Sequence, residues 1–242
     1  MAAGAIVTGA ARGIGLAIAG RLAREGYAVT ATDHDASGLA DAAARIAAQG
    51  LSLRAVAMDV TDRAAVRAVA QCIEGLEVVV NNAGVASPMT AFEAISPDEW
   101  RRVLGVNTKG VFIVTQEMLR VLRPGGRIIN IASRGYLGGA GAAHYVASKA
   151  AVVGLTRALA VELRWRGISV NAVAPGMVDT PMIAAFTPQE MSALLAREPQ
   201  GRPASPDAIA DVAAFLASPA ARALNGQVIF ADGGKTVGMP PL

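Results

Sequence analysis

A tyrosine and a lysine one helical turn apart are the first residues whose types and spacing suggest chemistry. They are Tyr145 and Lys149, within "HYVASKAAV", and the chain holds only three tyrosines. On a helix, side chains four positions apart share one face, with Cβ atoms about 5–6 Å apart. A lysine that close should lower the pKa of the tyrosine from about 10 and make it a useful acid–base group near neutral pH. The same spacing also suits a surface tyrosine beside a solvated lysine, so the rest of the chain has to decide.

A glycine-rich stretch near the start of the chain could hold phosphates. "TGAARGIG", residues 8–15, follows an apolar run and opens a helical pattern. Its glycines let the backbone turn tightly and approach a ligand, and the N–H groups at the start of a helix suit a pyrophosphate. The spacing is G-x-x-x-G-x-G rather than the commoner G-x-G-x-x-G. We expect cofactor contacts from Gly9, Arg12, Gly13, Ile14 and Gly15.

Asp33 ends the second expected strand, 24 residues beyond Gly9. A carboxylate there can accept hydrogen bonds from both adenosine ribose hydroxyls and would repel a 2′-phosphate, which predicts NAD rather than NADP. Arg12 is a basic residue that could favour the 2′-phosphate, but the carboxylate should dominate. The alternative is that Asp33 only caps the next helix, a task that Asp35 or Ser37 could perform instead.

Short β-branched runs and alanine-rich helical stretches alternate along the chain and define the elements that must position these residues. The patterns predict seven strands, at Ala5–Thr8, Ala28–Thr32, Ser52–Ala57, Val78–Val80, Arg127–Ile131, Ser169–Val173 and Gln227–Phe230. They predict helices over 14–25, 36–49, 62–73, 97–121, 143–166 and 206–217. Such alternation indicates βαβ units, which build a parallel sheet with helices on both faces.

The predicted fold class is therefore α/β, with a single Rossmann-like, doubly wound parallel sheet of about seven strands. No linker, repeat or low-complexity tract interrupts the pattern, so we expect one dinucleotide-binding domain over 1–242. The stretch 181–205 is the one long break in the alternation, and prolines punctuate it. Long excursions of this kind are often binding loops, so we expect a substrate lid there with one or two short helices.

The composition excludes several classes of function. The 242 residues are 53% hydrophobic and 17% charged, which is typical of a globular chain with a sizeable core. A net charge of +3 with scattered arginines favours no nucleic-acid partner, and no apolar run is long enough to span a membrane. Two histidines and one cysteine leave no metal cluster of the usual kind, so we expect no metal. The lone cysteine and the absence of a basic leader indicate a cytoplasmic protein.

Eight motifs, in order, resemble those of the short-chain dehydrogenase/reductase family over essentially the whole chain. They are "TGAARGIG", "MDVTD", "NNAG", "VNTKG", "INIAS", "YVASK", "NAVAPGMVDTPM" and "NGQVIFADGG". One departure is that the segment between Asp59 and Asn81 is a few residues shorter than in typical members. The resemblance implies hydride transfer between a nicotinamide cofactor and a secondary alcohol or ketone, in which the protein supplies placement and charge.

The resemblance also assigns roles to single residues. Tyr145 would be the general acid–base and Lys149 would lower its pKa while holding the nicotinamide ribose. Ser133 would orient the substrate oxygen, and Asn107 would hold a water that connects Lys149 to solvent. Thr180 would bind the nicotinamide carboxamide. With Tyr145 and Lys149, the further cofactor contacts would be Asp59, Val60, Asn81, Ala83, Gly84, Pro175, Gly176 and Val178.

The substrate is the open part of the prediction. Arg134 could pair with an acidic substrate or only with a surface acid, and His144 could touch substrate or simply pack. Tyr136 could cap the pocket, and apolar lid residues could line it: Met182, Ile183, Phe186, Met191, Leu194 and Leu195. The main alternative function is an NADPH-dependent 3-oxoacyl reductase, against which Asp33 argues. A catalytically idle dinucleotide-binding protein is the other alternative, against which the full Asn–Ser–Tyr–Lys set argues.

By resemblance, we expect a homotetramer in which helices 97–121 and 143–166 pack against their copies. Trp165, near the end of a predicted helix, could anchor such an interface or cover the core. The C-terminal tail after the last strand could also contribute to an interface or to the substrate site.

Overall fold

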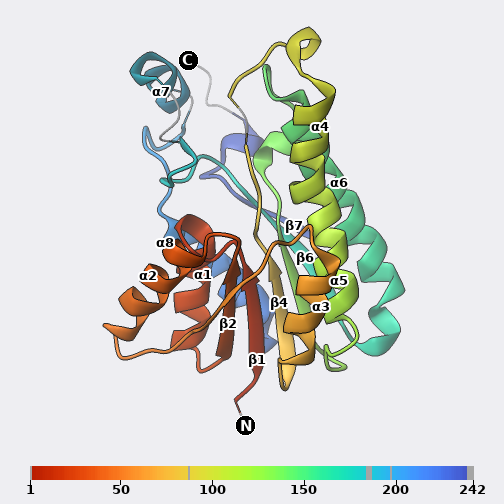
Figure 1. The fold of residues 1–242 in the computed structure, drawn as a ribbon. Helices are drawn as coiled ribbons and strands as arrows, with labels where there is room; N and C mark the ends of the chain where they lie inside the picture. The colour runs from red at the N-terminus through yellow and green to blue at the C-terminus, as the bar shows by residue number, and fades with distance from the viewer. Residues whose placement is uncertain (1, 87, 184–186, 197, 239–242) are drawn as a thin grey trace.

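One seven-stranded parallel sheet forms the centre of the molecule (Figure 1). The computed structural model describes residues 2–86, 88–183, 187–196 and 198–238. The strands are β1 (Gly4–Thr8), β2 (Ala28–Asp33), β3 (Arg54–Ala57), β4 (Leu76–Asn81), β5 (Arg127–Ile131), β6 (Ser169–Pro175) and β7 (Val228–Ala231). Their order in the sheet is β3-β2-β1-β4-β5-β6-β7. The order reverses between β1 and β4, which is the point where a sheet of this type opens a crevice for a ligand.

Helices cover both faces of the sheet. The α-helices are α1 (Gly13–Arg24), α2 (Ala36–Ala47), α3 (Arg63–Gln71), α4 (Pro97–Leu104), α5 (Val111–Met118), α6 (Ala143–Glu162), α7 (Pro188–Leu195) and α8 (Pro206–Ala217). Figure 1 shows α1, α2 and α8 on one side of the sheet and α3, α4, α5 and α6 on the other. Helix α7 lies beyond the edge where the strands end. The N-terminus lies at the opposite edge.

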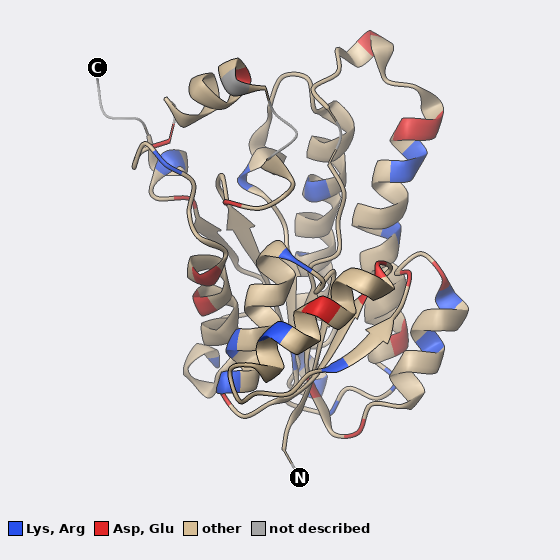
Figure 2. Cartoon of the chain, turned by 60° about the vertical axis from the view of Figure 1, so that its left-hand side comes forward, with Lys and Arg blue, Asp and Glu red and all other residues tan. Residues whose placement is uncertain are grey.

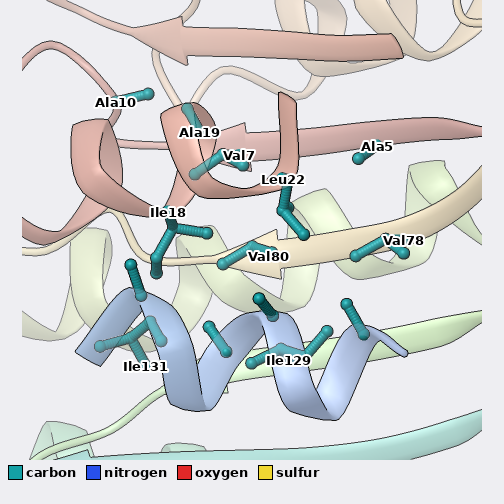
Figure 3. Packing of buried hydrophobic residues seen from close by; sticks show 14 of the residues in the cluster. Ala5, Val7, Ala10, Ile18, Ala19, Leu22, Val78, Val80, Ile129 and Ile131 are labelled. Carbon is teal, nitrogen blue, oxygen red and sulfur yellow. The ribbon is translucent and has the colours of Figure 1, made fainter. Parts of the chain in front are cut away.

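The period-2 alternation of each strand divides the core into two layers. Ala5 and Val7 of β1 pack in one buried cluster with Ile18 and Leu22 of α1, as Figure 3 shows. Ile6, between them, belongs to the second cluster, on the side of α3 and α5. Because side chains on a strand alternate between faces, a central strand buried on both faces must be apolar throughout. Strand β1 is apolar up to its last residue, Thr8, and all five of its residues are buried.

All seven predicted strands are confirmed, each within two residues at either end. Five of the six predicted helices are present as continuous α-helices over most of their expected length, although the last residues of 143–166 form a separate 3-10 turn, Arg164–Arg166. The prediction of one helix over 97–121 is wrong in detail. A π-helical turn, Gly105–Gly110, separates α4 from α5. The side chain of Asn107 bonds out of this turn to the main chain of Val85, which is consistent with a local widening of the helix.

Surface features complete the description of the fold. In the view of Figure 2, basic and acidic residues are interspersed along the helices. Among the described residues, no helix is long and apolar enough to cross a bilayer, and no group of three His, Cys, Asp or Glu side chains is placed to hold a metal ion. Cys72 is exposed. Trp165 is 84% exposed, so it does not cover the core.

Candidate active site

The first part of the site is the turn between β1 and α1, at the point where the strand order reverses. Gly9 has φ +67°, and a Cβ there would lie 2.8 Å from the Cα of Ala83, at the end of β4. A Cβ on Gly15 would lie 2.1 Å from the carbonyl oxygen of Gly9. Only glycine fits at these two positions, because any side chain would collide with backbone. At these two positions the loop therefore presents main-chain atoms without side chains where it crosses the end of the sheet.

The N-terminus of α1 completes a cradle for an anion. Its N-cap residue is Arg12, which makes no side-chain capping bond, and the first turn holds no acidic residue. Within the described part of the chain, the first N–H groups of this helix are thus left without a side-chain acceptor, although helix starts are usually capped. With the helix dipole, such N–H groups favour a bound phosphate. Gly13, Ile14 and Gly15 lie in this first turn, so the residues present fit the pyrophosphate of a dinucleotide.

Asp33 lies beside this cradle as the last residue of β2. Its carboxylate accepts hydrogen bonds from the main-chain N–H of Ala11 at 3.1 Å and of Asp35 at 3.1 Å, and His34 Nδ1 lies 3.0 Å away. Asp33 caps no helix, because Asp35 caps α2 by accepting from the N–H of Gly38. Arg12 lies nearby, 3.6 Å from Asp35 and largely exposed. The carboxylate is thus fixed next to the glycine loop.

Other predicted cofactor contacts gather along the same edge. Asp59 and Val60 follow β3, and the main chain of Ala83 and Gly84 follows β4. Pro175 ends β6, with Gly176 and Val178 directly after it. A Cβ on Gly13 would lie 3.2 Å from Thr180 Cγ2, so the start of the segment after β6 meets the glycine loop.

Asn81 is the exception among these residues. Its side chain is buried and donates to Thr115 at 2.9 Å and to Asn130 at 2.8 Å. It therefore points into the core between β4, β5 and α5. A contact from Asn81 to a cofactor would have to come from its main chain.

Ser133, Tyr145 and Lys149 meet next to the ends of β5 and β6. Ser133 lies two residues beyond β5, and its Oγ accepts from the N–H of Gly135 at 3.0 Å. Ser133 and Tyr145 meet at Gly135, where a Cβ would lie 3.2 Å from Ser133 Oγ and 3.7 Å from Tyr145 Cε1. Lys149 Nζ lies 5.9 Å from the centroid of the Tyr145 ring and donates to the carbonyl of Ile131 at 2.8 Å. The predicted pair thus shares one face of α6, and that face is turned toward the sheet edge.

The pKa of Tyr145 does not follow the prediction. Burial raises it above its usual value of 10, and the hydrogen bond with Ser133 lowers it by less. The expectation that Lys149 lowers it fails in the protein alone, because desolvation of the phenol is the largest effect on this pKa and Lys149 is not among the groups that shift it. Desolvation lowers the pKa of the lysine to about 8. Removing both groups from water disfavours both charged forms.

Asn107 lies behind Lys149 and is fully buried. Its Oδ1 accepts from the N–H of Val85 at 2.8 Å, and its Nδ2 donates to the carbonyl of Val85 at 2.9 Å and to Ser148 Oγ at 3.1 Å. A Cβ on Gly84 would lie 3.3 Å from Asn107 Oδ1 and 3.5 Å from Lys149 Nζ, so Asn107 and Lys149 meet at the same glycine. The structure brings all four predicted catalytic residues into one region.

Thr8 and Asn82 are positioning residues that sequence reasoning did not single out. Asn82 Nδ2 donates to the carbonyls of Thr8 at 2.9 Å and Gly9 at 3.0 Å, and Thr8 Oγ1 accepts from the N–H groups of Asn82 and Ala83. These bonds tie the glycine loop to the end of β4. Both residues lie inside the family motifs, but the sequence does not indicate that their side chains bond to residues more than 70 positions away.

The structure also places the residues that the sequence suggested for a substrate pocket. Tyr136 stacks on Phe230 with ring centroids 5.9 Å apart. His144 is fully buried, and neither ring nitrogen has a hydrogen-bond partner among the described residues. In the predicted lid, α7 contains Met191, Leu194 and Leu195, while Met182 is 46% exposed and Ile183 is half-buried. Phe186 lies outside the described residues.

The sheet order and the bare glycine turn define a Rossmann-like nucleotide-binding protein. A family model described as enoyl-(acyl carrier protein) reductase matches residues 9–236. The chain belongs to the short-chain dehydrogenase/reductase family, and it is an oxidoreductase of that family.

Several relatives are similar over nearly their whole length. The BbsD subunit of a hydroxy(phenyl)methylsuccinyl-CoA dehydrogenase from Thauera aromatica is 39% identical over 96% of both chains. A cis-4-hydroxycyclohexanecarboxylate dehydrogenase from Sinomonas cyclohexanicum is 40% identical over 96% of both. The 3-oxoacyl-(acyl-carrier-protein) reductase FabG of Vibrio cholerae is 37% identical over 95% of this chain and 96% of its own.

Two solved structures share the fold closely. One, from Beutenbergia cavernae, carries the provisional description of an NAD(P)-dependent gluconate 5-dehydrogenase and holds NADP at low occupancy. It has a TM-score of 0.91 and 40% identity over 98% of this chain and 97% of its own. The other is a single-residue variant of actinorhodin polyketide ketoreductase with NADPH, with a TM-score of 0.90 and 36% identity over 97% of both chains.

Proposed function

We propose that the protein transfers hydride between NAD(H) and a secondary alcohol or ketone, with Tyr145 as the general acid–base. The observation that carries this proposal is that Ser133 and Tyr145 meet at Gly135 while the buried ammonium of Lys149 lies 5.9 Å from the centroid of the Tyr145 ring. The relatives support the substrate class, because their names describe hydroxy compounds that are dehydrogenated or an oxo group that is reduced.

In this proposal each residue of the site acts on the substrate oxygen or on the proton that it gains or loses. Ser133 donates to the oxygen and fixes its place, and Tyr145 exchanges the proton with it. Lys149 holds the ribose and supplies positive charge near the phenol. Asn107 holds a water that connects Lys149 to solvent. The nicotinamide supplies the hydride chemistry when it is bound. A phenol with a raised pKa is protonated at neutral pH, which suits donation to a carbonyl.

Tyr145→Phe tests the acid–base role. The substitution removes only the phenolic oxygen, so kcat should fall by about 10²–10⁴-fold, the usual contribution of a general acid–base. The Kd for NADH, measured by fluorescence titration, should change little. Tyr27→Phe is the matched control, because Tyr27 donates to the carbonyl of Ala217, far from the site. Unchanged turnover in Tyr145→Phe would refute the role.

The preference for NAD(H) rests on Asp33. Its fixed carboxylate can accept from two ribose hydroxyls, and it would lie against a 2′-phosphate. We expect kcat/KM to be at least about tenfold higher with NADH than with NADPH. Asp33→Asn should lower kcat/KM with NADH by about tenfold or more, as expected for the loss of hydrogen bonds to a charged acceptor. The difference in kcat/KM between NADH and NADPH should therefore narrow. Asp35→Asn is the control, since it alters a neighbouring helix cap.

The rival proposal is an NADPH-dependent 3-oxoacyl reductase. The FabG relatives, the NADP and NADPH in the two similar structures, and the exposed guanidinium of Arg12 favour it. A tenfold or greater preference for NADPH, together with turnover of a 3-oxoacyl thioester, would establish this rival and exclude the NAD(H) proposal.

We further propose that residues 1–242 act as one catalytic domain, with 181–205 as its lid, in a cytoplasmic homotetramer.

A further inference from the structure

The guanidinium of Arg134 is a charged group beside the catalytic residues that the proposed chemistry does not use. Arg134 follows Ser133 directly and opens the short 3-10 turn Arg134–Leu137. Its Nε is buried and has no hydrogen-bond partner among the described residues. Its side chain is 28% exposed, so part of the guanidinium still reaches open space. A buried donor of a charged group is costly when it is left without an acceptor.

The nearest acid does not provide that acceptor. Asp232 Oδ2 lies 4.0 Å from Arg134 Nε, which is too far for a hydrogen bond. The carboxylate is instead occupied by the turn that follows β7. It accepts from the N–H of Gly234 at 3.1 Å, from the N–H of Thr236 at 2.8 Å and from the Thr236 hydroxyl. Asp232 thus helps to offset the charge of Arg134 but does not accept a hydrogen bond from its Nε.

The position of the side chain places this donor at the substrate end. Ser133 follows β5, Gly176 follows β6 and Asp232 follows β7, and these strands are parallel neighbours. A Cβ on Gly176 would lie 3.0 Å from Asp232 Cβ. Arg134 therefore extends from the end of β5 past the end of β6 toward the residue that follows β7. A substrate whose oxygen binds Ser133 and Tyr145 would place its next few carbons here.

We propose that Arg134 binds a carboxylate of the substrate, so that the enzyme acts on a hydroxy acid or oxo acid rather than on a neutral alcohol. This inference rests on the proposed function and narrows its substrate class. The planar guanidinium suits a carboxylate, since it can donate two parallel hydrogen bonds. The acid would sit a few carbons from the reacting oxygen, because Arg134 and Ser133 are adjacent residues.

A binding measurement tests the inference without turnover. Butanoate and pentanoate are titrated by calorimetry into the wild type saturated with NADH, with butanamide and pentanamide as neutral matches. We expect the acids to bind at least about tenfold more tightly than the amides, as a charge-assisted pair should. Arg134→Met should abolish this difference, and Arg134→Lys should retain part of it. Equal binding of acids and amides to the wild type would overturn the inference.

Turnover separates this inference from the proposed function. Linear hydroxy acids of four to six carbons are compared with their methyl esters, and each is oxidised with NAD. We expect kcat/KM to favour the acids in the wild type, and Arg134→Met to lose about 10–100-fold on the acids while the esters change by less than about threefold. If esters and acids are oxidised equally, only the role of Arg134 fails. If acids bind but nothing is oxidised or reduced with either cofactor, the proposed function fails, and only the binding of a carboxylate by Arg134 stands.

A structural role for Arg134 makes a different prediction. If the guanidinium served only to anchor the turn after β7 through Asp232, Arg134→Met would lower the melting temperature and reduce turnover of acids and esters alike. That result would contradict the inference.

Discussion

At the scale of single residues, burial changes what the catalytic side chains do on their own. The spacing of Tyr145 and Lys149 in the sequence predicts that the lysine lowers the pKa of the tyrosine. In the folded protein, desolvation opposes ionisation of both groups, so the pKa of Tyr145 rises and that of Lys149 falls. Burying these two groups lowers the stability of the folded protein, which is a common feature of sites that need shifted pKa values.

Replacing Lys149 should therefore stabilise the protein while it removes activity. The pKa of Lys149 falls from 10.5 to about 8 on folding, so burying the charged form costs about 3 kcal/mol below pH 8. Lys149→Met removes that cost but loses the hydrogen bond from the ammonium to the carbonyl of Ile131, worth about 2 kcal/mol because the donor is charged. We expect the free energy of unfolding at pH 7 to rise by about 1 kcal/mol in urea titrations without cofactor.

The pH dependence of this gain follows from the sign of the shift. Between pH 8 and 10.5 the unfolded chain holds a proton on Lys149 that the folded protein has lost, so the burial cost in the wild type shrinks as the pH rises through this range. The advantage of Lys149→Met should therefore shrink between about pH 8 and 10. A variant that is less stable than the wild type at both pH 7 and pH 10, by the same amount, would contradict this account.

At the scale of elements, the strands and helices follow from local patterns, and the exceptions follow from contacts between distant residues. Strand β5 was predicted to the residue, because "RIINI" is a β-branched run that follows glycines and ends just before a serine. The π-turn around Asn107 was not foreseen, because it accompanies bonds to Val85, 22 positions away. For the same reason the sequence did not reveal that the Asn81 side chain points to Thr115 and Asn130.

The same limit applies to the candidate site. The family motifs identified the four proposed catalytic residues, and the structure brings them together. The motifs could not indicate that Arg134 Nε and the His144 ring nitrogens are buried without a hydrogen bond among the described residues, since this depends on burial by other elements. Residue type and spacing therefore predict the composition of the site better than they predict its charge state.

Glu117 joins two helices through a contact that no local pattern predicts. Its carboxylate on α5 is fully buried and meets Arg63 and Arg67 of α3 as well as Arg120, at 2.6–3.1 Å. Hydrogen bonds, first from Arg67 and also from Arg63, lower its pKa to about 2, although burial acts in the opposite direction. This ion pair network fixes α3 against α5, next to the contact between Arg63 and the Phe112 ring.

Glu117→Gln should destabilise the protein in a pH-dependent way. An acid that is paired in the folded state adds stability above its unfolded pKa of about 4.5, and that stability is lost as the pH falls through 4.5 toward 2. The urea midpoint of Glu117→Gln should therefore be lower than that of the wild type at pH 7. The difference between the two midpoints should narrow at acid pH. Glu77→Gln is the control, since Glu77 pairs with Arg123 at the surface, where such pairs contribute little. Equal effects of the two substitutions would exclude the assigned role.

At the scale of the whole molecule, α6 presents an exposed face of small and apolar side chains. Ala150, Ala151, Gly154 and Ala158 are exposed along it, and Val161 at its end is 59% exposed. These positions recur every three or four residues, so they form one stripe on the side opposite the sheet. Small residues allow two helices to approach closely, and the family resemblance predicts that this helix packs against its copy in a homotetramer.

Ala151→Arg tests that assembly, because a long charged side chain on the stripe would hold two copies of α6 apart. In the wild type, light scattering should give four times the chain mass of 24.6 kDa. The variant should give half of that or less, with unchanged far-UV circular dichroism. Ala44→Arg makes the same chemical change on an exposed position of α2, on the other face of the sheet, and should leave the mass as it is. If Ala151→Arg stays tetrameric, α6 is not the interface. If the wild type is monomeric, the stripe is a surface of another kind and the predicted assembly is wrong.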